Sequence, residues 1–345
     1  MYIKFMNVEN KNIYISYWLL LITSLVGLII IVGGLTRLTD SGLSITEWNL
    51  ISGILPPLSL NDWEKLFTLY KQIPEFKLLN SSMTLDEFKI IFWWEYIHRL
   101  LGRLIGILYI FPLIFFTYKR MLDRKTILFF YSIFFLICLQ GIMGWFMVKS
   151  GLTERTDVSH YLLSIHLTLA FIIFTLLFWN YLKYKSFQFA QINKKLPFNL
   201  PIIFMIFIIL QISLGALVSG LDAGQIYQTW PLMNEKIFPN DSSYADLFSL
   251  KLFETPSLLQ FMHRNLAYFI FLLFLIIFLF VFKNNKYAHL KKITLLVFGV
   301  LVLQIFLGIL TILSGAQIIL ASIHQIGSII LVASSLLLVF KDSKN

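Results

Sequence analysis

The chain has 345 residues, of which 58% are hydrophobic and only 13% are charged. A soluble domain could not bury so much apolar surface, so this composition excludes an ordinary soluble protein and indicates an integral membrane protein. The formal net charge of +10 would suit a nucleic-acid-binding protein, but the excess of basic over acidic residues lies on one side of the apolar segments and predicts membrane topology instead.

Eight continuously apolar segments follow one another along the chain. Each is long enough to cross a bilayer as a helix, which takes ~20 residues. Backbone groups in lipid must be paired within their own segment, so we expect helices and not the short alternating strands of a barrel. The first segment is too long for a cleavable signal peptide. The predicted spans are residues 16–37, 98–118, 127–148, 160–182, 200–220, 262–282, 293–313 and 318–340.

The loops on one side of these spans carry sixteen basic residues and only three acidic ones, Glu9, Asp123 and Asp342. By the positive-inside rule this side is cytoplasmic, and both termini lie on it. No nucleic-acid partner is expected. The basic residues are Lys4, Lys11, Lys119, Arg120, Arg124, Lys125, Lys183, Lys185, Lys194, Lys195, Lys283, Lys286, Lys291, Lys292, Lys341 and Lys344.

The chain contains an internal duplication. Residues 33–48 and 215–230 share glycine, aspartate and tryptophan at a constant offset of 182 positions, and both stretches lead into a long outer loop. Each half has an even number of spans, so the repeats are parallel and related by an axis roughly along the membrane normal. We therefore predict an all-α membrane protein of two pseudo-symmetric four-helix bundles, an N-terminal one in 1–190 and a C-terminal one in 191–345.

A Leu-Gln-x-x-x-Gly hexad begins at Leu139, Leu210 and Leu303. The glutamine and the glycine are one helical turn apart. This spacing predicts a small-residue packing face with a polar hydrogen-bonding group, and packing alone could account for it.

Four histidines stand at matching places in the two halves. His98 matches His263 at an offset of 165 residues, and His166 matches His324 at an offset of 158. Ionisable residues inside spans are costly and are usually functional. A neutral imidazole is a good ligand for haem iron, and two facing helices with one histidine each can hold a haem from both sides. A single such histidine could be a packed core residue, but four in a repeat predict two haem sites.

Arginines and tryptophans accompany these histidines. Arg99 and Arg264 match across the repeat, and Arg103 lies a turn further along in the first half. A guanidinium suits the propionate groups of a haem because it binds carboxylates bidentately, although arginines at a helix end also extend toward the interface without a ligand. Trp48 and Trp230 either cover the two sites or belong to an interfacial aromatic belt.

The two halves differ three residues before the first histidine, where Glu95 in the first half corresponds to Gln260 in the second. Both side chains share a helix face with their histidine. A carboxylate beside a haem can act as a base or stabilise positive charge, and an amide can do neither. The mismatch therefore assigns chemistry to the first half and a resident cofactor to the second. Alternatively, Glu95 forms an ion pair with Arg99 or Arg103.

The chain resembles the haem A synthase family of the cytochrome oxidase assembly pathway, in its proteobacterial and mitochondrial branch. The resemblance rests on the eight spans, the duplicated histidine pairs, the Glu-Tyr-Ile-His-Arg motif at 95–99 and the outer stretch at 33–44. It implies oxidation of the C8 methyl group of haem O to a formyl group by successive hydroxylation. Some bacterial members have a cysteine pair in the first outer loop, which is absent here.

The resemblance also implies the site residues. Substrate haem O would lie between His98 and His166, a haem b would be held by His263 and His324, and Glu95 matches the family's essential acidic residue. The bacterial inner membrane is the expected location. The implied partners are the lipid bilayer, haem O synthase, cytochrome oxidase assembly factors and a second copy of the chain.

Two other functions compete with this interpretation. A di-haem b electron-transfer subunit would have ligands near both membrane faces, whereas all four histidines here are predicted near the outer face. A transporter built from parallel repeats would have broken helices with polar groups at the midplane. The single cysteine, Cys138, is expected to be a buried packing residue.

Overall fold

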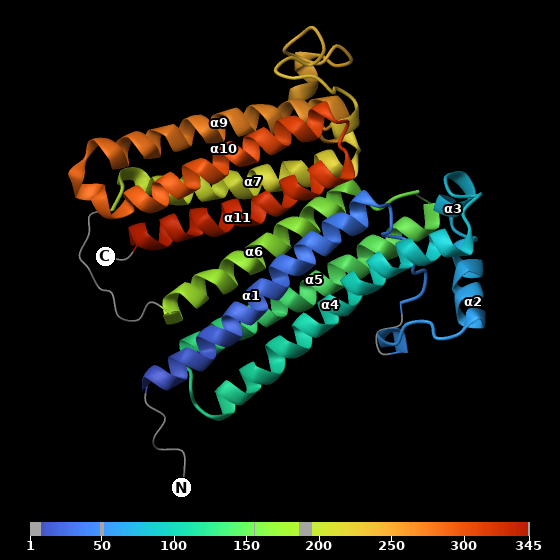
Figure 1. Ribbon diagram of the computed structural model, residues 1–345, viewed down its shortest axis with the longest axis horizontal. Helices are drawn as coiled ribbons and strands as arrows, with labels where there is room; N and C mark the ends of the chain where they lie inside the picture. Colours follow the sequence, from blue (N-terminus) through green and yellow to red (C-terminus); the bar gives the residue numbers. More distant parts are fainter. Residues whose placement is uncertain (1–7, 49–51, 155, 186–194, 344–345) are drawn as a thin grey trace. The chain divides into compact units, whose positions relative to one another are not determined.

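The structure is a computed structural model that describes residues 8–48, 52–154, 156–185 and 195–343. The predicted domain boundary at 190/191 and three of the topology-determining lysines (Lys4, Lys194 and Lys344) lie outside these residues. The α-helices, drawn in Figure 1, are α1 (Val8–Leu38), α2 (Leu60–Tyr70), α3 (Pro74–Leu78), α4 (Leu85–Tyr118), α5 (Arg124–Glu154), α6 (His160–Lys185), α7 (Leu200–Gly220), α8 (Lys251–Glu254), α9 (Pro256–Lys283), α10 (Lys291–Leu313) and α11 (Ile318–Ser343).

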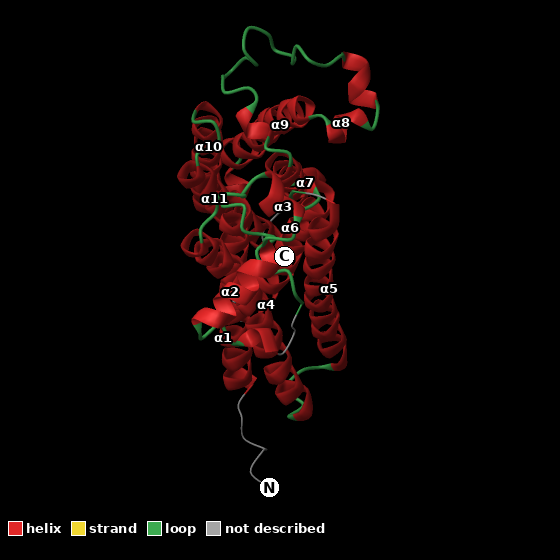
Figure 2. Ribbon diagram, turned by 90° about the vertical axis from the view of Figure 1, so that its right-hand side faces the viewer, coloured by secondary structure: helices red, strands yellow, loops and turns green. Residues whose placement is uncertain are grey.

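Eight helical segments are long and apolar enough to cross a membrane, and each contains one predicted span. Figure 2 shows helices joined by loops, and no β-strand occurs in the described part of the chain. Large apolar side chains such as Phe111, Leu272 and Phe306 are exposed on these helices, as expected where the surrounding solvent is lipid. The all-α membrane fold is confirmed. Cys138, however, is exposed on α5, so the expectation that it packs in the interior was wrong.

The second membrane helix is longer than its apolar segment. α4 begins at Leu85, thirteen residues before His98, and not at residue 98 as predicted. Its start is fixed by a capping box, in which Thr84 accepts from the backbone N–H of Glu87 and the Glu87 side chain accepts from the backbone N–H of Thr84. His98 therefore lies well inside a continuous helix.

The connection between α1 and α4 folds into helices and packs on the first turns of α4. α2 also begins with a capping box, formed by Ser59 and Asp62. The connection and α4 share a mostly aromatic core. This buried core comprises Leu43, Phe67, Tyr70, Ile73, Phe88, Ile91, Phe92, Tyr96 and Val158.

The described chain divides into two compact units, residues 21–174 and residues 1–20 with 175–345. In the first of these units, hydrogen bonds between helices show which helices are neighbours. Thr36 on α1 donates to the backbone carbonyl of Trp94 on α4, and Tyr109 on α4 donates to that of Phe130 on α5. Gln140 on α5 donates to the backbone carbonyl of His166 on α6, so α1, α4, α5 and α6 are neighbours in that order.

The other unit repeats this order with α7, α9, α10 and α11. α7 packs against α9, α9 against α10, and α10 against α11, and α11 also contacts α7. These four helices can be followed in yellow to red in Figure 1. Each helix that carries one of the four matched histidines therefore packs against the equivalent helix in its own unit.

Candidate functional site

Each of the four histidine rings lies against a glycine of the neighbouring helix. A Cβ added to Gly33 would lie 2.8 Å from Cε1 of His98, and one added to Gly144 would lie 3.1 Å from Cε1 of His166. The second half repeats these contacts. The corresponding distances are 3.1 Å for Gly215 and His263, and 2.9 Å for Gly308 and His324.

Real Cβ contacts below 3.0 Å essentially never occur, and contacts of 3.0–3.4 Å require the neighbour to move. Only glycine therefore lets the imidazole approach the adjacent helix this closely. The glycines are needed here for the space that they leave and not for their backbone conformation, because all four lie inside helices.

Three of the four histidines are also held through their backbone. The side-chain amide of Gln140 donates to the carbonyl oxygen of His166 at 2.9 Å, and the amides of Gln211 and Gln304 make the same bond to His263 and His324, also at 2.9 Å. These glutamines belong to the Leu-Gln-x-x-x-Gly hexads, and the glycine of each hexad faces the same histidine. The hexad is thus a histidine-holding element, more specific than the general packing face that its spacing predicts.

The histidines pair within each half. His98 is among the neighbouring groups of His166, and His324 is among those of His263. Within the described residues, Nδ1 of each ring is buried and has no hydrogen-bond partner, whereas Nε2 of His263 lies 3.2 Å from Nε2 of Gln211. Buried imidazole nitrogens without partners, presented in pairs by facing helices, fit the axial ligation of a haem iron. The described residues contain no cluster of three or more His, Cys, Asp or Glu side chains suited to a different metal ion.

Glu95 is almost completely buried, with 3% of its surface exposed, and it is surrounded by donors. Its Oε2 accepts from the Ser44 hydroxyl at 2.7 Å and from the backbone N–H of Ile45 at 2.8 Å. Its Oε1 accepts from Nε of Arg99 at 3.0 Å and from Nη2 at 2.5 Å. The ion pair with Arg99, one of the two alternatives from the sequence, is therefore present. This contact orients the carboxyl group.

The two matched arginines connect to the loops that follow α1 and α7. Nη2 of Arg99 donates to the carbonyl of Ile45 at 2.9 Å, and Nη2 of Arg264 donates to the carbonyl of Tyr227, also at 2.9 Å. Residues 45 and 227 are themselves related by the offset of 182, so the duplication includes this contact. Both guanidinium groups thus hold a loop, and their binding of propionates stays a prediction.

Gln260, the counterpart of Glu95, hydrogen-bonds to the equivalent loop residue of its own half, but it donates where Glu95 accepts. Its Nε2 donates to the carbonyl of Tyr227 at 3.1 Å, whereas Glu95 accepts from the N–H of Ile45. An amide and a carboxylate thus occupy equivalent places, and both are buried. Only the first half has a carboxyl group there.

The remaining predicted site residues lie nearby. The guanidinium of Arg99 lies over the Trp48 ring at 5.0 Å, and Nε1 of Trp230 donates to the Tyr268 hydroxyl at 3.0 Å. Both tryptophans are partly exposed, so neither is buried over a site. Arg103 is partly buried on α4, one turn beyond Arg99. The roles of Trp48, Trp230 and Arg103 stay predictions.

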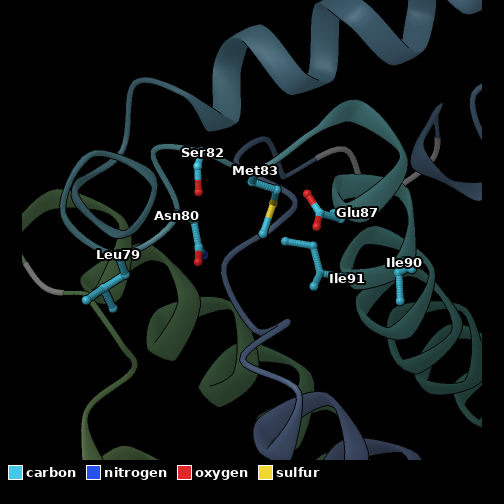
Figure 3. Close-up of a pocket in the computed structure, with 7 residues that line it drawn as sticks. All are labelled: Leu79, Asn80, Ser82, Met83, Glu87, Ile90 and Ile91. Atoms are coloured by element: carbon cyan, nitrogen blue, oxygen red, sulfur yellow. The ribbon is translucent and has the colours of Figure 1, made fainter.

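A shallow surface hollow of about 270 Å³ lies at the start of α4, apart from the histidines. Its carboxylate, Glu87, is already engaged in the helix cap with Thr84, so the hollow offers no charged group for a ligand. Figure 3 shows the side chains around it, which are Leu79, Asn80, Ser82, Met83, Glu87, Ile90 and Ile91.

Two groups of functional residues were not assigned a role from the sequence. Ser44 orients Glu95, and its only sequence signal is its place in the motif-rich stretch at 33–44. The glycine Gly33 and the hexad glutamines were recognised as a pattern but not as contacts of the histidines. Their signal was the constant spacing between glutamine and glycine within a repeated unit.

The sequence matches known proteins over nearly its whole length. The sequence model of the COX15-CtaA family, described as "Cytochrome oxidase assembly protein", matches residues 16–336. A protein of Pelagibacter ubique named "Heme A synthase" is 50% identical over 345 residues, covering 98% of this chain and 99% of the relative.

Relatives with the same name occur in Rickettsia. The protein of Rickettsia bellii is 44% identical over 329 residues, covering 94% of this chain and 96% of the relative. The protein of Rickettsia africae is 41% identical over 323 residues, covering 92% and 95%. Because the family model and these relatives span nearly the whole chain, the chain belongs to the COX15-CtaA family, the family of the haem A synthases.

Proposed function

We propose that the first half holds haem O between His98 and His166, and that the second half holds a resident haem b between His263 and His324. The chain is a haem A synthase, a multi-pass enzyme of the bacterial inner membrane that oxidises haem O to haem A for cytochrome oxidase assembly. The observation that carries the placement of the two haems is the repeated seat of each histidine against a glycine of the next helix.

The residues of the second half favour permanent binding. Both His263 and His324 receive a glutamine hydrogen bond on their backbone carbonyl and have a glycine behind their ring. A haem b bound there would supply an iron that accepts and passes on electrons. Gln260 introduces no charge beside it, which suits a cofactor that is not itself chemically changed.

The residues of the first half favour chemistry. Conversion of a methyl group to a formyl group removes electrons and protons from one carbon and adds an oxygen. We propose that Glu95 provides the fixed negative charge that stabilises positive charge at that carbon or accepts its proton. Ser44, Arg99 and the Ile45 N–H are positioning groups, because they hold the carboxylate in one orientation.

The substitution Glu95→Gln tests this assignment without a large structural change, since Gln260 shows that an amide fits the equivalent place. The variant should retain bound haem and yield no formyl product when its pigments are extracted and separated. The reciprocal variant Gln260→Glu is the matched control and should still produce haem A. Normal haem A formation by Glu95→Gln would reduce Glu95 to a structural partner of Arg99.

His263→Ala and His324→Ala test the cofactor site. Each should abolish the absorption of the second-half haem while leaving haem O binding in the first half. Unchanged spectra in both would disprove the pairing. Extracted pigment also separates the enzyme from a di-haem b electron carrier, which would contain haem b alone.

The remaining proposals concern organisation in the membrane. The sixteen basic residues on one side support cytoplasmic termini, and a reporter fused to the C-terminus would test this. The duplication supports two pseudo-symmetric bundles, 1–190 and 191–345.

Haem O synthase, cytochrome oxidase assembly factors and a second copy of the chain are the proposed partners, testable by co-purification. Arg103 and Arg264, with Arg99, are the proposed propionate-binding groups.

A further inference from the structure

Three candidate ligands share the glutamine contact and one does not. His166, His263 and His324 each have a glutamine amide on their carbonyl oxygen. In each case this glutamine stands four residues before the glycine behind the ring. Four residues before Gly33, which lies behind His98, the chain has Ile29.

Ile29 occupies the place where the amide would be. Its Cδ1 lies 3.7 Å from a Cβ built on Gly102, which is one turn beyond His98 on α4. Ile29 therefore lies in the contact between α1 and α4, but it has no donor. In the described residues, no side chain hydrogen-bonds to the carbonyl of His98. Thr36 does join the two helices, at 3.3 Å, but its bond goes to the carbonyl of Trp94, a turn before His98.

The free energy of the missing glutamine hydrogen bond is large enough to change the rate of ligand exchange. A hydrogen bond within a membrane or protein interior contributes about 0.5–1.5 kcal/mol net, which corresponds to about a two- to tenfold change in a rate or equilibrium. The glutamine bond also fixes the backbone of the ligand directly. A histidine that is held only by packing can move away from a haem iron at a lower free-energy cost than one whose backbone is also bound by glutamine.

We propose that His98 is the exchangeable ligand of the first half, and that Ile29 in place of glutamine is what makes it so. This inference rests on the proposed function, because only a site for a substrate needs to open. His166 keeps its glutamine and holds the porphyrin, while release of His98 lets haem O bind and haem A leave. In the second half both ligands are fixed, as a resident cofactor requires.

Carbon monoxide measures ligand release directly, since it binds a ferrous haem only after one axial histidine has dissociated. The full-length protein, reduced under anaerobic conditions with haem b in place and haem O added, is mixed with carbon monoxide and followed by absorbance. The first-half haem should give a fast phase and the second-half haem a slow one. Ile29→Gln should slow the fast phase about two- to tenfold. It should leave the slow phase unchanged.

Gln211→Ile is the matched control, because it removes the equivalent glutamine from the second half, together with the 3.2 Å contact of that glutamine with Nε2 of His263. It should speed the slow phase by a similar factor. If Gln211→Ile has this effect while Ile29→Gln leaves the fast phase unchanged, His98 is not the exchangeable ligand. If Ile29→Gln does not fold, Gln211→Ile and Gln304→Ile still decide the premise, since an unchanged slow phase in both would overturn it.

Failure of the proposed function would look different. If haem O does not bind and the protein contains only the second-half haem, with no fast phase, both the substrate site and this inference are wrong. If two haems bind but Ile29→Gln does not slow the fast carbon monoxide phase, the proposed substrate site is retained and the proposed role of Ile29 is wrong.

Discussion

The contact between Gly308 and His324 makes the sharpest prediction about the cofactor site. In Gly308→Ala the new Cβ would lie 2.9 Å from Cε1 of the imidazole, whereas ordinary contacts begin at 3.4 Å. The ring must therefore retreat by about 0.5 Å, the difference of these values, to restore an ordinary contact. Overpacking of this kind costs about 1–3 kcal/mol, so we expect haem affinity to fall by about fivefold to a hundredfold.

The same helix provides the control. Gly299 is also inside α10, and a Cβ there would meet nothing within 4 Å. Gly299→Ala should be neutral or should stabilise the helix by up to about 1 kcal/mol, because alanine has the higher helix propensity. Both variants gain this propensity, so the difference between them isolates the contact with the histidine.

The assay is loss of haem from the purified protein to an excess of a haem-free globin, followed by absorption. Gly308→Ala should release the second-half haem faster than the wild type, and Gly299→Ala should not. Equal release from all three proteins would show that the ring does not need its place against the glycine, and the haem seat derived from that contact would be wrong.

Three further outcomes are expected. Gly144→Ala should weaken haem binding in the first half, whereas Gly141→Ala, on the same helix with nothing within 4 Å, should not; haem O titration monitors both. Burial raises the pKa of Glu75 to about 8 from 4.5, so the folded state retains a proton that the unfolded state loses. Stability should therefore fall as pH rises from about 4.5 to 8, by at most about 1.4 kcal/mol per pH unit, and Glu75→Gln should remove this slope in denaturation measurements. Arg264→Lys should loosen the loop at Tyr227, detected as faster hydrogen exchange there.

The helices and the duplication could be predicted because they depend on patterns that are visible in the sequence without knowledge of the tertiary contacts. Continuous apolar runs specify spans whatever their neighbours are, and a constant offset identifies equivalent positions without coordinates. That is why Ile45 and Tyr227, which no motif singles out, turn out to receive the same arginine contact.

The extension of α4 and the folded α1–α4 connection were missed because their signals are local and weak. Hydropathy marks the start of α4 near residue 98, but the helix is continued outward by the capping residues Thr84 and Glu87 and by aromatic packing against Phe67. The glutamine contacts were missed for a different reason. A glutamine in an apolar helix can bond to several partners, and only the packing of the neighbouring helix selects the histidine carbonyl.

Two of the positions at which the halves differ chemically are on α1 and α4, the helices that meet at His98. Glu95 replaces the neutral Gln260, and Ile29 replaces the donor Gln211, and both act around His98. One change supplies a charge where a methyl carbon would be oxidised, and the other removes a restraint where a ligand would open. Together these two differences fit the proposed contrast between a site that keeps its porphyrin and one that transforms it. In this proposal each difference needs the other, because a charged site that cannot open retains its product, and an open site without the carboxylate only exchanges haem.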